Sequence, residues 1–184
     1  MSTTDESPAG APDSSGEKAA MEMNQIVLPQ HSNALGTVFG GTIMSWIDIC
    51  AAMAAQRHSR SVVVTASMDQ LDFLQPIKVG QLVNMRATIN YVGRSSMEVG
   101  VRVESENMLS GERIHTASAY LTFVALDEHG RAKPVPPITP QTAAEKLRYR
   151  EAEARREQRI ELAKKRSLLA LEASREQGGE EAGR

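Results

Sequence analysis

The chain has 184 residues, with 21 Lys and Arg against 23 Asp and Glu, for a formal net charge of -2. The charges are uneven: residues 141–184 hold 11 bases and 9 acids, whereas residues 21–140 hold only 9 and 10. A core with so few charges and no basic run is not expected to bind nucleic acid. We predict one domain over 21–140, between a disordered acidic extension, 1–20, and a charged C-terminal helix and tail, 141–184.

Membrane insertion and secretion are also not expected. No uncharged apolar run reaches the roughly 18 residues that a membrane-spanning helix needs. The N-terminus is acidic and has no apolar segment of the kind found in a secretory signal, so we expect a cytoplasmic protein. The single cysteine, Cys50, excludes an internal disulfide and a cysteine-based zinc site, and the four His show no metal-ligand spacing.

The predicted elements begin with a short strand over 24–28, which Pro29 ends. Residues 42–56 are apolar nearly all the way round and predict a helix buried in the core. A strand over 62–75 follows, and three further strands alternate apolar and polar residues, at 82–92, 97–104 and 114–126.

Turn residues at Gly93-Arg94 and Ser110-Gly111 predict antiparallel neighbours among these strands. One central helix and about five strands predict an α+β fold in which an antiparallel sheet wraps around the helix.

Residues 142–174 predict a long charged helix, because they contain neither Gly nor Pro. No apolar heptad runs through them, so we expect an exposed helix and not a coiled coil. Some 30 helical residues span about 45 Å, which is more than a small domain needs. The helix therefore either lies across a neighbouring subunit or is solvated and partly frayed.

Asp48 is the residue most indicative of function. It is the only charge between Glu22 and Arg57, and it falls inside the most apolar helix. Burying a carboxylate there costs several kcal/mol unless it is paired. It could pair with Arg57, Arg60 or an arginine on a strand, or be a hydrogen-bonded core residue. We favour a functional role, because carboxylates in such surroundings cluster at active sites.

The start of the same helix is a second candidate. Phe39-Gly40-Gly41 places free backbone N–H groups where the helix dipole favours negative charge, so Gly41 could bind an oxyanion. Asp48 follows Gly41 by seven residues and returns to a similar face. Alternatively, the glycines only permit a tight turn. Asn33, in the preceding loop, could orient a water, although its spacing alone favours a local turn hydrogen bond.

The run from His31 to Asp48, with its N-x-x-G-x-x-F-G-G loop and helix Asp, resembles the signature of hotdog-fold acyl-coenzyme A thioesterases. The resemblance continues, in the same order, through residues 63–69, 72–80 and 92–99, and covers about residues 23–140. It implies hydrolysis of acyl-coenzyme A to a free acid and coenzyme A. Coenzyme A is part of the substrate and product, so neither a cofactor nor a metal is expected.

The resemblance also implies roles for residues and an assembly. Asp48 would act as general base or nucleophile, Asn33 of the partner subunit would position water or substrate, and the Gly41 N–H would polarise the carbonyl. The sheets of two subunits would join edge to edge in a homodimer, and three such dimers would form a hexamer. The residues implied in binding substrate or coenzyme A are Phe39, Gly40, Thr65, Gly93, Arg94, Ser95 and Ser96.

Two questions stay open in the sequence. The core holds few bases for a phosphate-rich ligand, so anchoring must be local, with Arg94, Arg57 and Arg60 as candidates. The alternative function is a non-catalytic acyl-coenzyme A-binding regulator on the same fold. Such a regulator would usually carry a DNA-binding segment, and residues 1–20 contain only one base. A hydratase of this fold would use a His in a loop pattern that is absent from the sequence.

Overall fold

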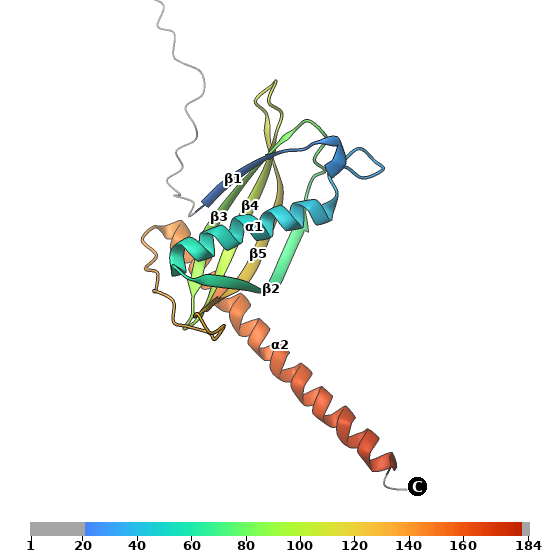
Figure 1. Ribbon diagram of the computed structural model, residues 1–184, viewed down its shortest axis with the longest axis vertical. Coiled ribbons are helices and arrows are strands. Elements are labelled where there is room, and N and C mark those ends of the chain that lie inside the picture. The colour runs from blue at the N-terminus through green and yellow to red at the C-terminus, as the bar shows by residue number, and fades with distance from the viewer. Residues whose placement is uncertain (1–20, 182–184) are drawn as a thin grey trace, which may run out of the picture.

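The computed structural model describes residues 21–181, with side chains as far as residue 170, so the predicted disordered extension lies outside the described residues. A five-stranded antiparallel sheet has the order β1-β3-β4-β5-β2. Helix α1 packs against one face, here named the inner face, and helix α2 crosses the opposite, outer face (Figure 1). The elements are β1 (Met21–Ile26), a short 3-10 helix (Pro29–His31), α1 (Gly40–Ser59), β2 (Val62–Phe73), β3 (Leu82–Val92), β4 (Ser96–Glu106), β5 (Arg113–Leu126) and α2 (Ala143–Glu181).

The core lies between α1 and the inner face of the sheet. The alternation predicted for β4 is confirmed, since Met97, Val99, Val101 and Val103 are all buried on this face. From α1, Ile47 and a run of small residues complete the core. Small residues let the helix approach the sheet closely, so the strands curve around it. The predicted α+β hotdog arrangement is thus confirmed.

Two predicted elements differ from the structure. The first strand begins at Met21 and ends at Ile26, because Met21 and Met23 pack against the core while Leu28 is exposed. Helix α1 is longer than predicted, and its expected burial all the way round is wrong. Met44 and Ile49 are 42% and 48% exposed, because the sheet covers only one side of the helix.

The C-terminal helix differs more. It begins after a capping box in which Glu145 accepts hydrogen bonds from the Gln141 and Thr142 N–H groups. Its expected exposure is wrong for the first half: Ala152 is fully buried and Arg155 is largely covered, because this half lies on polar side chains of the outer face. Residues 160–170 are exposed, as predicted, and extend past the sheet (Figure 1).

Strand β2 is an edge strand. It pairs only with β5 along its 12 residues, and two register shifts interrupt that pairing, after Thr65 and after Met68. Its other edge has backbone groups without a strand partner, and exposed apolar side chains lie along it and on the open side of α1. No helix among the described residues is long and apolar enough to cross a membrane.

Candidate functional site

Asp48 and Thr65 form the centre of the site. The half-buried Asp48 lies on α1, and its Oδ1 accepts a hydrogen bond of 2.7 Å from the Thr65 hydroxyl on β2. Within the described part of the chain, Asp48 has no ion-pair partner, so the predicted alternative of a pair with Arg57 or Arg60 is wrong. The second carboxylate oxygen therefore remains available to a substrate or a water molecule.

The start of α1 provides backbone donors. The first helical N–H groups, of Gly40 and Gly41, have no acceptor among the described residues. The first hydrogen bonds of the helix are donated by the N–H groups of Thr42 and Ile43 to the Phe39 carbonyl. The Phe39 ring covers Gly41, and a methyl group added there would overlap its Cε1 and displace the ring. Glycine therefore lets the ring lie this close, and the backbone N–H is the polar group of this segment.

Spacing along α1 relates these donors to Asp48. Seven helical residues cover about 10 Å and return to within about 20° of the same direction. Gly41 and Asp48 are therefore on one face of α1, with their Cα atoms about 10 Å apart along the axis. Because a helical side chain leans toward the N-terminus, the Asp48 carboxylate lies closer to Gly41 than that. A thioester carbonyl hydrogen-bonded at Gly41 can therefore have one water molecule between its carbonyl carbon and Asp48.

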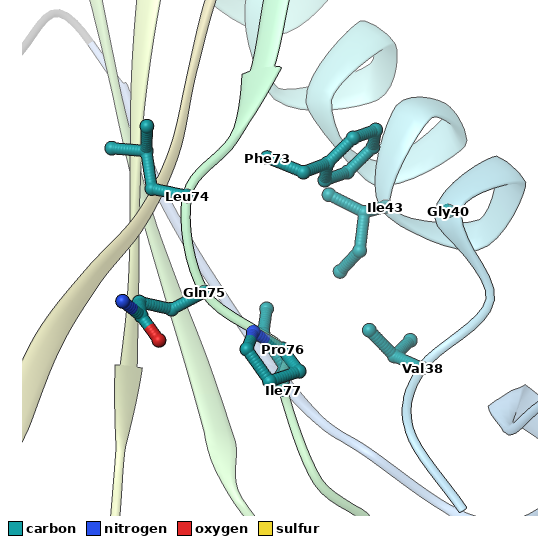
Figure 2. A pocket seen from close by; sticks show the side chains of 8 residues that line it. All are labelled: Val38, Gly40, Ile43, Phe73, Leu74, Gln75, Pro76 and Ile77. Carbon is teal, nitrogen blue, oxygen red and sulfur yellow. The ribbon is translucent and has the colours of Figure 1, made fainter. Parts of the chain in front are cut away.

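An apolar cavity of about 320 Å³ opens beside Gly40 (Figure 2). The Phe73 ring, Ile43 and Val38 form its walls between α1 and the end of β2, and Pro76 and Ile77 border it below. The volume is that of a small-molecule pocket, and the lining is apolar with a polar backbone at one end. Such a cavity suits a hydrocarbon chain attached to a group held at the helix start.

The loop containing Asn33 is ordered by that residue. Asn33 Oδ1 accepts hydrogen bonds from the Leu35 and Thr37 N–H groups, and its Nδ2 donates to the Thr37 hydroxyl. These bonds form a turn and leave the exposed Asn33 without a bond to Asp48 in this subunit. One subunit therefore brings together Asp48 and Thr65 but not Asn33.

The turn from Gly93 to Ser96 lies at the same end of the sheet as Thr65. Thr65 pairs with Phe123, and Phe123 pairs with Met97, which places the turn about 10 Å from Thr65 across two strand spacings. Backbone bonds hold the turn: Gly93 donates to Ser96, Ala125 donates to Ser95, and Val135 donates to Arg94.

Arg156 is a base near this turn that the sequence did not indicate. Its Nε lies 3.8 Å from the position that a Gly93 Cβ would occupy, and it comes from α2. No local pattern distinguishes it among the 11 bases of residues 141–184. Arg57 and Arg60 lie at the far end of α1, roughly 25 Å from Gly40.

Cys50 is unsuited to nucleophilic chemistry. The residue is fully buried, and burial raises the pKa of its thiol to about 11, so the thiolate is scarce at neutral pH. Among the side chains of residues 21–170, no cluster of three or more His, Cys, Asp or Glu could hold a metal ion.

Comparison with protein families and relatives agrees with the geometry. Residues 35–112 match the model of the thioesterase superfamily. An uncharacterized acyl-CoA thioester hydrolase of Bacillus subtilis is 44% identical over 133 residues, which are 72% of this chain and 77% of that protein. A human cytosolic acyl coenzyme A thioester hydrolase is 34% identical over 132 residues, 71% of this chain and 35% of that protein.

Solved structures give the same result. A hexameric acyl-CoA thioesterase shares 46% identity at a TM-score of 0.75, covering 77% of this chain and 91% of the other. An acyl-CoA hydrolase from Staphylococcus aureus, in complex with butyryl coenzyme A, coenzyme A and coenzyme A disulfide, shares 41% identity at a TM-score of 0.74. The match covers 82% of this chain and 93% of the other. Further structures of the Staphylococcus protein have alanine in place of an aspartate, a threonine or an asparagine.

Proposed function

We propose that this chain, which belongs to the hotdog-fold thioesterase superfamily of acyl-coenzyme A hydrolases, cleaves acyl-coenzyme A thioesters through Asp48. The observation that supports this most is the Asp48–Thr65 pair, about 10 Å from free N–H groups on the same helix face. The residues replaced in the Staphylococcus protein are of the same types as Asp48, Thr65 and Asn33. Hydrolysis needs only water as co-reactant, so we expect neither a metal nor a cofactor.

The spacing favours Asp48 as a general base acting through water. Thr65 holds one carboxylate oxygen, and the other accepts a proton from a water as that water attacks the thioester carbonyl carbon. The negative charge that develops on the carbonyl oxygen is stabilised by the Gly41 N–H and the helix dipole. Collapse of the intermediate breaks the carbon–sulfur bond, and the proton passes from Asp48 to the departing thiolate.

Completion of the site requires a partner subunit. Strand β2 has an unpaired edge, and Met44, Ile49 and Phe73 are exposed near it, which supports a homodimer joined through the two β2 edges. In that dimer, Asn33 of the partner subunit faces Asp48. The hexameric relatives support assembly of three such dimers.

A shared site makes subunit complementation possible. Asp48→Ala and Asn33→Ala proteins are each expected to be nearly inactive, whereas mixing them and allowing subunits to exchange should restore up to about a quarter of wild-type sites. Thiol release after mixing measures this, with each variant mixed with itself as the control. No recovery despite exchange seen by native mass spectrometry would count against the shared site.

Coenzyme A is expected to bind along the turn from Gly93 to Ser96. Arg94 and Arg156 supply positive charge beside this turn, which supports both as partners for phosphate groups. The backbone bonds of the turn keep its N–H and C=O groups in fixed positions. We also propose a cytoplasmic location, in line with the cytosolic human relative.

The acyl chain is expected to occupy the cavity beside Gly40. Phe73→Ala removes one wall, so we expect kcat/KM for long chains relative to short chains to rise by about tenfold, the scale of one or two methylene contacts. A panel of acyl-coenzyme A esters of increasing length, followed by thiol release, measures the shift. Met108→Ala is the matched control, because Met108 is 51% exposed, close to the 53% of Phe73, but does not line this cavity.

The same panel separates the enzyme from the regulator alternative. Thiol release with at least one ester by the wild-type protein supports hydrolysis. Saturable binding of the esters without thiol release would instead favour a binding protein. An unchanged chain-length profile in Phe73→Ala would place the acyl chain elsewhere.

A further inference from the structure

Helix α2 crosses the outer face of the sheet along a single row of neighbouring residues. Tyr91 pairs with Glu98, Glu98 with Thr122, and Thr122 with Ser67, so the row runs from β3 through β4 and β5 to β2. Side chains of α2 contact residues in this row or next to it: Tyr149 lies against Tyr91, Arg155 against Glu98 and Tyr120, and Arg159 against Asp69.

This crossing ends at the β2 edge. The ten steps from Tyr149 to Arg159 cover about 15 Å, and three strand spacings are about 14 Å, so the helix has crossed all four strands by Arg159 and leaves the sheet there. The helix nevertheless continues to Glu181 (Figure 1). More than half of α2 therefore lies beyond the sheet of its own subunit.

The sheet-facing side of α2 continues past that edge in the same register. Steps of alternately three and four residues lead from Ala152 through Arg155 and Arg159 to Leu162, Arg166 and Leu169. Leu162 and Leu169 are 54% and 64% exposed, although they lie on the side that is packed in the first half of the helix. This continuation is suited to a second sheet beyond β2.

A matching apolar surface lies on the outer face itself. Val62 and Val64 pair with Leu126 and Val124, whereas their neighbours Val63 and Thr65 pair with core residues of the inner face. Val62 and Val64 are 61% and 44% exposed, and they lie at the β2 edge, where a partner's α2 would arrive. One subunit therefore has two exposed apolar surfaces, one on the second half of α2 and one at the β2 edge.

We infer that the second half of α2 docks on the outer face of the partner's β2 and β5, with Leu162 and Leu169 covering the apolar patch of Val62, Val64, Val124 and Leu126. The inference rests on the β2-edge dimer of the proposed function. Each helix then spans both sheets, and the dimer is held by two reciprocal helix contacts in addition to the paired strands.

Photo-crosslinking tests this contact directly. A benzophenone amino acid is placed at Leu162 or Leu169, and proteins labelled with 14N and 15N are mixed before irradiation, so that cross-links between subunits are recognised by mass. Both positions are expected to link to residues 62–73 or 113–126 of the other subunit. Leu168 is the matched control, because it is 60% exposed but is turned around α2 by about 100° from Leu169 and about 120° from Leu162. Its yield is expected to be at least about tenfold lower.

Subunit exchange supplies the second measurement. Leu162→Asp/Leu169→Asp is expected to speed exchange of labelled and unlabelled subunits by about tenfold, and Leu168→Asp by less than about twofold. The inference would be overturned if Leu162 formed cross-links mainly to the partner's α2 or to surfaces other than the outer face of the partner's β2 and β5. An absence of cross-links between subunits would also overturn it. Thiol release is measured on the same samples: hydrolysis without these cross-links rejects only the docking, and cross-links without hydrolysis reject only the proposed activity.

Discussion

Asp48→Asn is expected to lower kcat for acyl-coenzyme A hydrolysis by at least about 100-fold, the usual scale for removing a positioned general base. Asparagine keeps the shape of the side chain and can still accept the Thr65 hydroxyl, but it cannot take a proton from water. Because the substitution preserves the contact with β2, the loss should appear in kcat, with the free energy of unfolding almost unchanged. Thiol release and urea unfolding of both proteins check this.

Thr65 provides a graded comparison. Thr65→Val removes the hydroxyl that holds Asp48 and should lower kcat by about tenfold, the value of one hydrogen bond to a charged group. Thr65→Ser retains a hydroxyl and should recover most of that loss. Equal rates for wild-type and Asp48→Asn proteins would refute the mechanism, and equal rates for all Thr65 variants would show that the carboxylate needs no such support.

Single turnover in water labelled with 18O tests whether Asp48 acts as a nucleophile. If it is a base acting through water, the label enters the product acid and Asp48 stays unlabelled. Label in the peptide that contains Asp48 would establish a nucleophile, because water must then have attacked the enzyme carboxyl of a covalent mixed anhydride. The 10 Å spacing to Gly41 leads us to expect the first result.

The inner face of the sheet could be predicted from the sequence because its signal is local. The alternation in residues 82–92 reproduces β3 from its first residue to its last, since both ends of that strand contact the core. The helix Asp could be found for a similar reason: one carboxylate in an apolar run is conspicuous. Its partner Thr65, 17 residues away on an edge strand, has no such signal and was indicated only by resemblance.

The outer face could not be predicted in the same way. Alternation assigns Glu98 to the polar side of β4, which for an uncovered sheet means solvent, yet it is 3% exposed beneath α2. The residue that covers it, Arg155, is 57 positions further along, in a segment with no apolar repeat. Because α2 contacts the sheet through charged and aromatic side chains, its sequence looks like that of a helix exposed to solvent. The prediction of full exposure failed for that reason.

Arg155→Met is expected to lower the free energy of unfolding by about 3 kcal/mol, because it leaves the Glu98 carboxylate buried without a cation. In the wild-type protein, Arg155 binds both carboxylate oxygens of Glu98, at 2.7 and 3.1 Å, and its guanidinium lies 3.8 Å from the centre of the Tyr120 ring. Asn90 adds a hydrogen bond of 3.2 Å to Glu98 that cannot replace the lost charge. Urea unfolding at one fixed subunit concentration measures the change.

The double variant Glu98→Met/Arg155→Met separates the cost of an unpaired charge from the value of the pair. Replacing both partners removes the buried charge and retains apolar volume, so it should recover most of the stability lost in the single variant. Arg150→Met on the exposed side of α2 is the control and should change the free energy of unfolding by less than about 0.5 kcal/mol.

Hydrogen exchange shows where the single variant loosens. The first half of α2 is held on the sheet chiefly through this buried pair, the Arg159–Asp69 pair and the contact of Tyr149 with Tyr91. Amides of residues 143–159 should therefore lose protection in Arg155→Met, while β3 and β4 keep theirs. Loss of protection throughout the sheet would contradict this view. It would show that the Arg155–Glu98 pair stabilises the whole domain and does not only attach α2 to the sheet.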